Sequence, residues 1–227
     1  MSPAIEKKLT ELYDTYNNSV KLLVADIEAR TQHFPIEILN EVRAFTDHIA
    51  RCYLSEKTEA QHLEELKKAE GHIKRITLDC YKYLNIYLFD EVAYFEKRDM
   101  RHVDLSFIDN GKFYLKFKKL RREAVNLSRE ARKTESKDKP LSLQLYEKTY
   151  NKYNEIEQFI DDNSDKLAWA KKKFFKNNSV AILLWVIPII VSSVITWVVA
   201  TKHEKTKEES KMEMIIHPED SLLLEQE

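Results

Sequence analysis

The sequence predicts an all-α protein, a bundle of four or five helices followed by one C-terminal transmembrane helix. Three observations predict this fold class. Only 2 Gly and 5 Pro interrupt 227 residues, of which 33% are charged. Apolar residues recur at steps of three and four through most of residues 1–178. The segment VAILLWVIPIIVSSVITWVVA, residues 180–200, carries no charge at all.

Two helices are expected before residue 55. Pro3 follows Ser2, a typical helix start because proline is favoured at the first helical position. Apolar residues then keep a helical spacing to about residue 31, which predicts one amphipathic helix. The run HFP, residues 33–35, ends it, and a second helix is expected over about residues 35–54.

Three further helices are expected before the membrane segment. Thr58 and Gln61 form a capping-box pattern that opens a helix continuing to about residue 98. The DNG turn signal at residues 109–111 precedes a helix over about 112–134. After the loop sequence SKDKP, a fifth helix begins near residue 141, and it can run through Trp169 into the membrane.

Residues 180–200 are long enough to cross a membrane. At about 1.5 Å per residue, 21 uncharged residues span roughly 30 Å, the thickness of the hydrocarbon layer. Trp185 and Trp197 lie toward the two ends, where interfacial indoles are typical. The alternative is a helix of a soluble core, which in a domain of this size usually keeps a polar stripe toward solvent, whereas only three hydroxyl residues interrupt this run.

Charge around this segment indicates an orientation. Four lysines crowd residues 171–176 on the N-terminal flank, and Lys202, Lys205 and Lys207 lie on the C-terminal flank, so the larger basic cluster precedes the span. The N-terminus lacks the apolar stretch of a signal peptide. We therefore expect a single-pass protein of the bacterial inner membrane, with a cytoplasmic bundle at 1–178, a transmembrane helix at 179–201 and a flexible charged tail at 202–227.

Four residues within the span are candidates for a pore or a helix contact: Pro188, Ser192, Ser193 and Thr196. Proline interrupts helical hydrogen bonding, and small hydroxyl residues in lipid commonly mark a helix–helix contact or a wet path. The alternative is that these hydroxyls bond back to their own backbone. One span cannot enclose a pore, so a channel would need several copies, and we expect a homo-oligomer.

The stretch ILNEVRAFTDHIARCY, residues 38–53, carries a polar face opposite its apolar one. That polar face includes Arg43, Asp47 and His48, and Arg43 can pair with Asp47 four residues on. One interpretation is a solvated surface. The other is RNA cleavage, in which His48 transfers a proton, Arg43 stabilises the phosphate charge and Asp47 orients the pair. Two copies meeting across a two-fold axis would be needed to surround a phosphate.

The run RAFTDH within this stretch resembles the R-x4–6-H motif of the HEPN superfamily, with Arg43 and His48 at the motif positions. The resemblance implies a four- or five-helix bundle that dimerises and cuts RNA in a shared cleft, although active members commonly have a polar residue where this chain has Ala44. A HEPN-like bundle with a membrane span is similar to the membrane-associated HEPN-like accessory proteins of type VI-B CRISPR systems. That similarity implies antiviral defence through an oligomeric membrane pore, with RNA or an RNA-guided nuclease as a partner.

Residues 112–137 form a second basic feature, with ten Lys and Arg against three acids. Contact with RNA phosphates, attraction to anionic lipid heads and a solvated helix face are all compatible with this pattern. The basic patch that we single out consists of Lys112, Lys116, Lys119 and Arg122.

Other chemistry has little support in the sequence. Cys52 and Cys80 fall on apolar faces and are expected to be buried thiols in a reducing compartment. No Gly-rich phosphate loop, metal-ligand spacing or nucleophile setting is present, so we expect no cofactor or metal, and no small-molecule substrate is evident. We favour a membrane effector of antiviral defence. The alternatives are a membrane-tethered ribonuclease and a non-enzymatic tail-anchored tethering protein.

Overall fold

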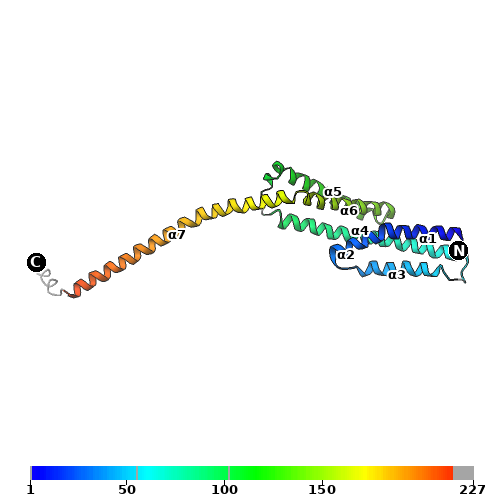
Figure 1. The fold of residues 1–227 in the computed structure, drawn as a ribbon, viewed down its shortest axis with the longest axis horizontal. Coiled ribbons are helices and arrows are strands. Elements are labelled where there is room, and N and C mark those ends of the chain that lie inside the picture. The colour runs from blue at the N-terminus through cyan, green and yellow to red at the C-terminus, as the bar shows by residue number, and fades with distance from the viewer. Residues whose placement is uncertain (1, 55, 102, 217–227) are drawn as a thin grey trace. The chain divides into compact units, whose positions relative to one another are not determined.

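The computed structural model describes residues 2–54, 56–101 and 103–216, and these residues form helices and no strand, which confirms the all-α prediction (Figure 1). Two cores and one long apolar helix account for this architecture. The elements in chain order are α1 (Pro3–Thr15), the π-helical η1 (Tyr16–Val20), α2 (Lys21–Thr31), α3 (Ile36–Arg51), α4 (Glu59–Arg98), the short 3-10 turns η2 (Leu105–Phe107) and η3 (Asp109–Gly111), α5 (Lys112–Thr134), α6 (Lys139–Asp161) and α7 (Ser164–Ile216).

The first predicted helix contains a π-helical segment. Backbone angles stay helical from α1 through η1 into α2, and the run ends where Gln32 adopts a left-handed conformation with φ of 52°. In a regular α-helix, residues eight apart would point about 80° apart. The wider turn of η1 absorbs this offset, so that Leu12 and Val20 both face the core.

Helix α4 is the central element of the bundle. Its Thr58 N-cap forms the predicted capping box with Gln61, and its 40 residues extend for about 60 Å. The first half packs with α1, η1, α2 and α3 around one apolar core. The second half packs with α5 and α6 around another, and Figure 1 shows the two groups of helices beside different parts of α4.

The connection between α6 and α7 differs from our expectation. A helix is present near residue 141 as predicted, but the continuous run into the membrane that the sequence allowed is not formed, because α6 ends at Asp161 and α7 begins at Ser164. Asn163 is buried at the break, where its side-chain amide donates to the carbonyl of Phe159 at 2.8 Å. An asparagine that bonds locally to the backbone competes with helix continuation.

Helix α7 carries the apolar segment. Among the described residues it is the one helix long and apolar enough to cross a membrane, and none of its most apolar stretch is buried within the chain. The chain divides into two compact units, residues 1–170 and 171–227. Residues 202–216, expected in a flexible tail, continue α7 as helix, while the rest of that predicted tail, residues 217–227, lies outside the described residues.

Candidate functional site

His48 of α3 faces α4 rather than solvent. Its Nδ1 lies 2.7 Å from Oε2 of Glu65, and the two side chains are only 16% and 10% exposed. The hydrogen bond from His48, together with Lys57 and Lys68 nearby, lowers the pKa of Glu65 to about 2. An ionised carboxylate can only accept, so His48 Nδ1 carries the proton and donates it.

A second histidine–glutamate pair lies beside the first. His72 Nδ1 of α4 is 2.6 Å from Oε2 of Glu41 on α3, and Arg75 Nε donates to the same oxygen at 2.9 Å. Burial raises the pKa of Glu41, but the hydrogen bonds from His72 and Arg75 outweigh it, and the net shift is downward. The rings of His48 and His72 stack with centroids 5.1 Å apart.

The two pairs are reciprocal. Helix α3 contributes Glu41 and His48, seven residues apart, and α4 contributes Glu65 and His72, also seven apart. Seven residues make about two helical turns, so each pair of side chains projects from one face of its own helix. In the antiparallel hairpin, each histidine therefore meets the glutamate of the other helix.

Arg43 and Asp47 do not join this cluster. Arg43 is exposed and forms no ion pair or hydrogen bond with the part of the chain that the structure describes. Asp47 pairs with Arg51 at 2.5 Å, so the pair expected between Arg43 and Asp47 is not formed. The carboxylate that orients His48 is Glu65 instead. Positions 43 and 48 point about 140° apart on an α-helix, which explains why one faces solvent and the other faces α4.

The cluster can position one histidine for proton transfer. Glu65 fixes the tautomer and the ring of His48, an arrangement that leaves Nε2 to exchange a proton. A cation that binds phosphate beside His48 would have to come from another residue or another copy of the chain, because Arg43 points away from His48. Across residues 2–54, 56–101 and 103–216, no group of three His, Cys, Asp or Glu side chains is placed to hold a metal ion.

The predicted basic patch on α5 is divided between several environments. Lys112, Lys119 and Arg122 are exposed and have no ionic partner among the described residues. Lys116 Nζ lies 4.6 Å from the ring centroid of Phe159, a cation–π distance. In one copy of the chain, the patch is therefore a mainly solvated surface whose cations do not converge on one site.

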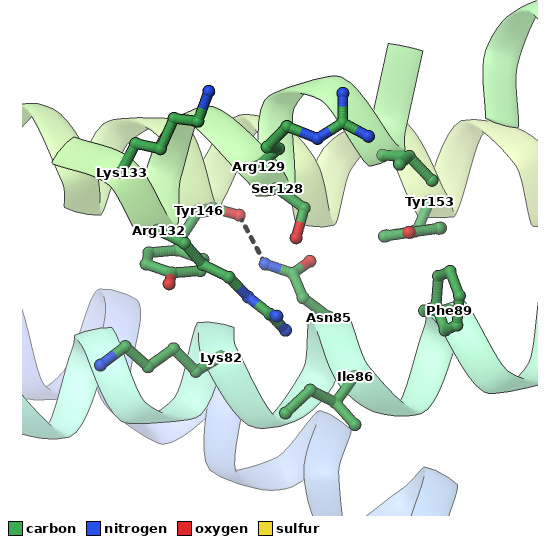
Figure 2. Close-up of a pocket in the computed structure, with 11 residues that line it drawn as sticks. Lys82, Asn85, Ile86, Phe89, Ser128, Arg129, Arg132, Lys133, Tyr146 and Tyr153 are labelled. Carbon is green, nitrogen blue, oxygen red and sulfur yellow. Dashed lines mark hydrogen bonds between the residues drawn. The ribbon is translucent and has the colours of Figure 1, made fainter. Parts of the chain in front are cut away.

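The C-terminal part of the same basic run lines a groove instead. Three α5 cations, Arg129, Arg132 and Lys133, line a cavity of about 590 Å³ between α4, α5 and α6, and Figure 2 shows Arg132 reaching toward α4. The basic run predicted at residues 112–137 includes these cations, whereas Asn85 on α4 was not singled out; its position among the buried apolar residues of that helix was the available signal. This groove includes neither Arg43 nor His48.

The hydroxyls of α7 bond to their own helix. Ser192 and Ser193 both donate to the carbonyl of Ile189, at 2.9 and 2.8 Å, and Thr196 donates to the carbonyl of Ser192 at 2.9 Å. The single chain thus adopts the backbone-bonded alternative. Each hydroxyl oxygen still has acceptor capacity toward a neighbour. Pro188 lies inside the helix and lacks the N–H that would bond the preceding turn.

The chain matches no protein-family model, no curated protein and no solved structure. Functional interpretation therefore depends on its own residues: a reciprocal histidine–glutamate cluster, a basic groove, and an apolar helix with one hydroxyl-bearing side.

Proposed function

We propose that this chain is a membrane-anchored effector that acts as a homo-oligomer and perturbs the membrane as a pore. The observation that carries this proposal is α7, whose apolar stretch can span the membrane and finds no partner helix within the described chain. A single-pass helix that carries three hydroxyl residues in its second half has a distinct side on which copies can meet.

The chemistry of that side supports assembly. Ser192, Ser193 and Thr196 fall within an arc of about 100° on the helix. Their protons are used within the helix, so the oxygens are left to accept from a neighbouring copy or from water in a lumen. Small side chains also let helix backbones approach closely in lipid.

A role in antiviral defence is supported by the resemblance of RAFTDH to the HEPN motif and by its combination with a membrane span. The lysines of residues 171–176 support an orientation with the helical bundle in the bacterial cytoplasm. In this proposal, an RNA-guided nuclease signals target recognition to the bundle, and the assembled α7 helices then change the permeability of the inner membrane.

Membrane potential is the measurement that tests this function. Bacteria would express the full chain beside a type VI-B RNA-guided nuclease and receive a matching transcript. We expect depolarisation with the wild-type chain and little with Ser192→Ala/Ser193→Ala, which removes two hydroxyls with little change in side-chain volume. The matched control, Val194→Ile, changes the opposite side of α7 and should behave as wild type. Unchanged potential in all strains would contradict the proposal.

Ribonuclease activity is the second candidate, and the hydrogen bond between His48 and Glu65 specifically favours it. Held in this way, His48 could act as the general acid or base, with Arg43 of another copy stabilising the phosphate. The purified full-length protein should then cut single-stranded RNA, and His48→Ala should abolish the cleavage. Equal cleavage by wild type and variant would exclude this role.

A further inference from the structure

The groove between α4, α5 and α6 has the size of a small-molecule site. Its volume is about 590 Å³, within the range of roughly 300–1,000 Å³ that is common for ligand clefts. All of its lining residues belong to the compact unit of residues 1–170. From its charge, its apolar wall and one buried acceptor, we propose that this groove binds a nucleoside phosphate.

Cations are distributed along the groove: Figure 2 shows Arg132 reaching toward α4, Lys133 extending away from α4, and the guanidinium of Arg129 turned toward the Tyr153 end. Arg129, Arg132 and Lys133 project from one side of α5, because residues three and four apart are neighbours on a helix. Lys82 of α4 adds a fourth cation, but it hydrogen-bonds with Glu135. Lys82 and Glu135 offset each other. The positive charges of Arg129, Arg132 and Lys133 then remain for a phosphate to balance.

Glu135 has two partners at this end. Besides Lys82, its Oε2 accepts from the hydroxyl of Tyr146 at 3.1 Å. Burial and that hydrogen bond raise the pKa of Tyr146 to about 12, so this hydroxyl stays protonated and continues to donate to Glu135 at neutral pH. Arg129 is exposed, and within the described part of the chain it donates only to the side chain of Asn126 on its own helix, at 3.3 Å. It can turn toward an anion at little cost.

The middle of the groove holds a buried acceptor without a partner. Asn85 is 5% exposed, and its Nδ2 donates to the backbone carbonyl of Tyr146 at 2.9 Å. This bond orients the amide and leaves Oδ1 buried, with no hydrogen bond to any residue that the structure describes. Buried polar atoms are almost always satisfied, because desolvating them without a partner is unfavourable. A ligand that reaches Asn85 must therefore present an N–H or O–H group there.

The opposite end is aromatic. Figure 2 shows Phe89 and Tyr153 at one end of the groove, Lys82, Arg132 and Lys133 toward the other, and Asn85 between them. Phe89 is 40% exposed, so its ring is accessible to a stacking partner. Planar bases stack on such rings largely irrespective of sequence.

A nucleoside phosphate satisfies all three parts at once. Its base can stack at the Phe89 end, and a base N–H or sugar O–H can donate to Asn85 Oδ1. Its phosphate can bind Arg132, and the exposed side chains of Arg129 and Lys133 can turn toward it. Inorganic phosphate would leave Asn85 and the aromatic end unused. A fatty acid would supply an anion and an apolar body but no donor for Asn85. The order of groups along the groove therefore favours a nucleotide over simpler anions.

The test is equilibrium binding to the purified full-length protein in detergent, with AMP as the probe and adenosine and inorganic phosphate as its separate halves. We expect AMP to bind at least tenfold more tightly than either half. Arg129→Glu/Lys133→Glu should weaken AMP binding at least tenfold. The matched control Lys119→Glu/Arg122→Glu makes the same charge change on exposed α5 positions outside the groove and should leave the affinity unchanged.

Asn85→Leu tests the buried acceptor and should weaken AMP binding severalfold while leaving phosphate binding as it was. Asn85 also holds the carbonyl of Tyr146, so a thermal melt accompanies this variant, and the α5 double variant remains informative if Asn85→Leu fails to fold. Equal affinity for AMP and inorganic phosphate would overturn the nucleoside assignment. Absence of saturable AMP binding, or binding of a single-stranded RNA oligomer without AMP binding, would overturn the proposal itself. It does not depend on pore formation.

Discussion

His48 on α3 donates a hydrogen bond from Nδ1 to Oε2 of Glu65 on α4, at 2.7 Å. The same hairpin repeats this relationship in reverse between His72 and Glu41. The two largely buried pairs therefore link α3 to α4 by polar contacts beside the apolar core that those helices share. The resemblance to the HEPN motif assigns His48 to catalysis, whereas its hydrogen bond to Glu65 gives it a structural role. That role predicts an effect on the stability of the bundle, which can be measured separately from any activity.

Loss of the Glu65 carboxylate should destabilise the bundle. Glu65 accepts from His48 and also pairs with Lys57 and Lys68, at 3.3 and 3.4 Å. Glu65→Gln keeps the shape but removes the charge, and we expect the free energy of unfolding to fall by about 1–3 kcal/mol. Urea unfolding of the full-length protein in detergent, followed by helical circular dichroism, measures this change.

Glu64→Gln is the matched control. Glu64 is the neighbouring residue, its side chain is 65% exposed, and it pairs only with Lys68 among the described residues. Exposed ion pairs contribute little, so this variant should unfold close to wild type. Equal loss of stability in both variants would show that charge in this turn of α4, rather than the contact with His48, is what matters.

Acid should weaken the fold over a defined range of pH. The pKa of Glu65 is lowered from 4.5 to about 2 by its partners, and Lys74 and Lys8 lower that of Glu70 to about 2 as well. Carboxylates with depressed pKa stabilise the folded state above their unfolded pKa. That stabilisation is complete above about pH 5 and is lost as the pH falls from 4.5 toward 2.

Melting temperature recorded against pH tests this expectation. The wild-type curve should fall steeply between pH 4.5 and 2, whereas Glu65→Gln should start lower and fall less steeply, because one of the titrating groups is gone. Identical slopes for the two proteins would mean that the Glu65 pairs do not contribute to acid sensitivity.

Periodicity and capping predicted most of the helices. The helix of α5 lies where the spacing placed it, and the Thr58–Gln61 capping box is present at the start of α4. These features are local, since the residues that decide them lie within a turn or two of one another. The break at Asn163 was missed because the apolar pattern continues across it, while the cause is a single side-chain bond to the carbonyl of Phe159.

The surroundings of His48 were harder to predict for a different reason. On its own helix, His48 lies at the border between the apolar and polar faces, and the neighbouring helix decides whether that border is covered. The signal was present as a matched spacing, Glu41 to His48 in one helix and Glu65 to His72 in the next. Recognising it requires pairing two helices, which the periodicity of either one alone does not specify.

The two cysteines should resist modification in the native protein. Both are free and buried, which agrees with the expectation from their apolar faces. Burial raises the pKa of Cys80 to about 12 and also raises that of Cys52, so neither supplies much thiolate near neutral pH. A thiol reagent at pH 8 should label fewer than one cysteine per chain under native conditions and two in urea. Rapid native labelling of both would contradict this arrangement.

The π-helical segment should tolerate a deletion that a regular helix would not. Removing the exposed Asn18 from η1 would shorten the wide turn to an α-helical one, so that Leu12 and the residues after it keep facing the core. Deleting Glu11 from α1 instead would rotate Ile5 and Leu9 by about 100° away from the core. Each displaced apolar side chain is worth about 1.5–3 kcal/mol when buried. Urea unfolding should therefore give the Asn18 deletion a clearly higher free energy of unfolding than the Glu11 deletion. The reverse order would show that η1 itself is needed for packing.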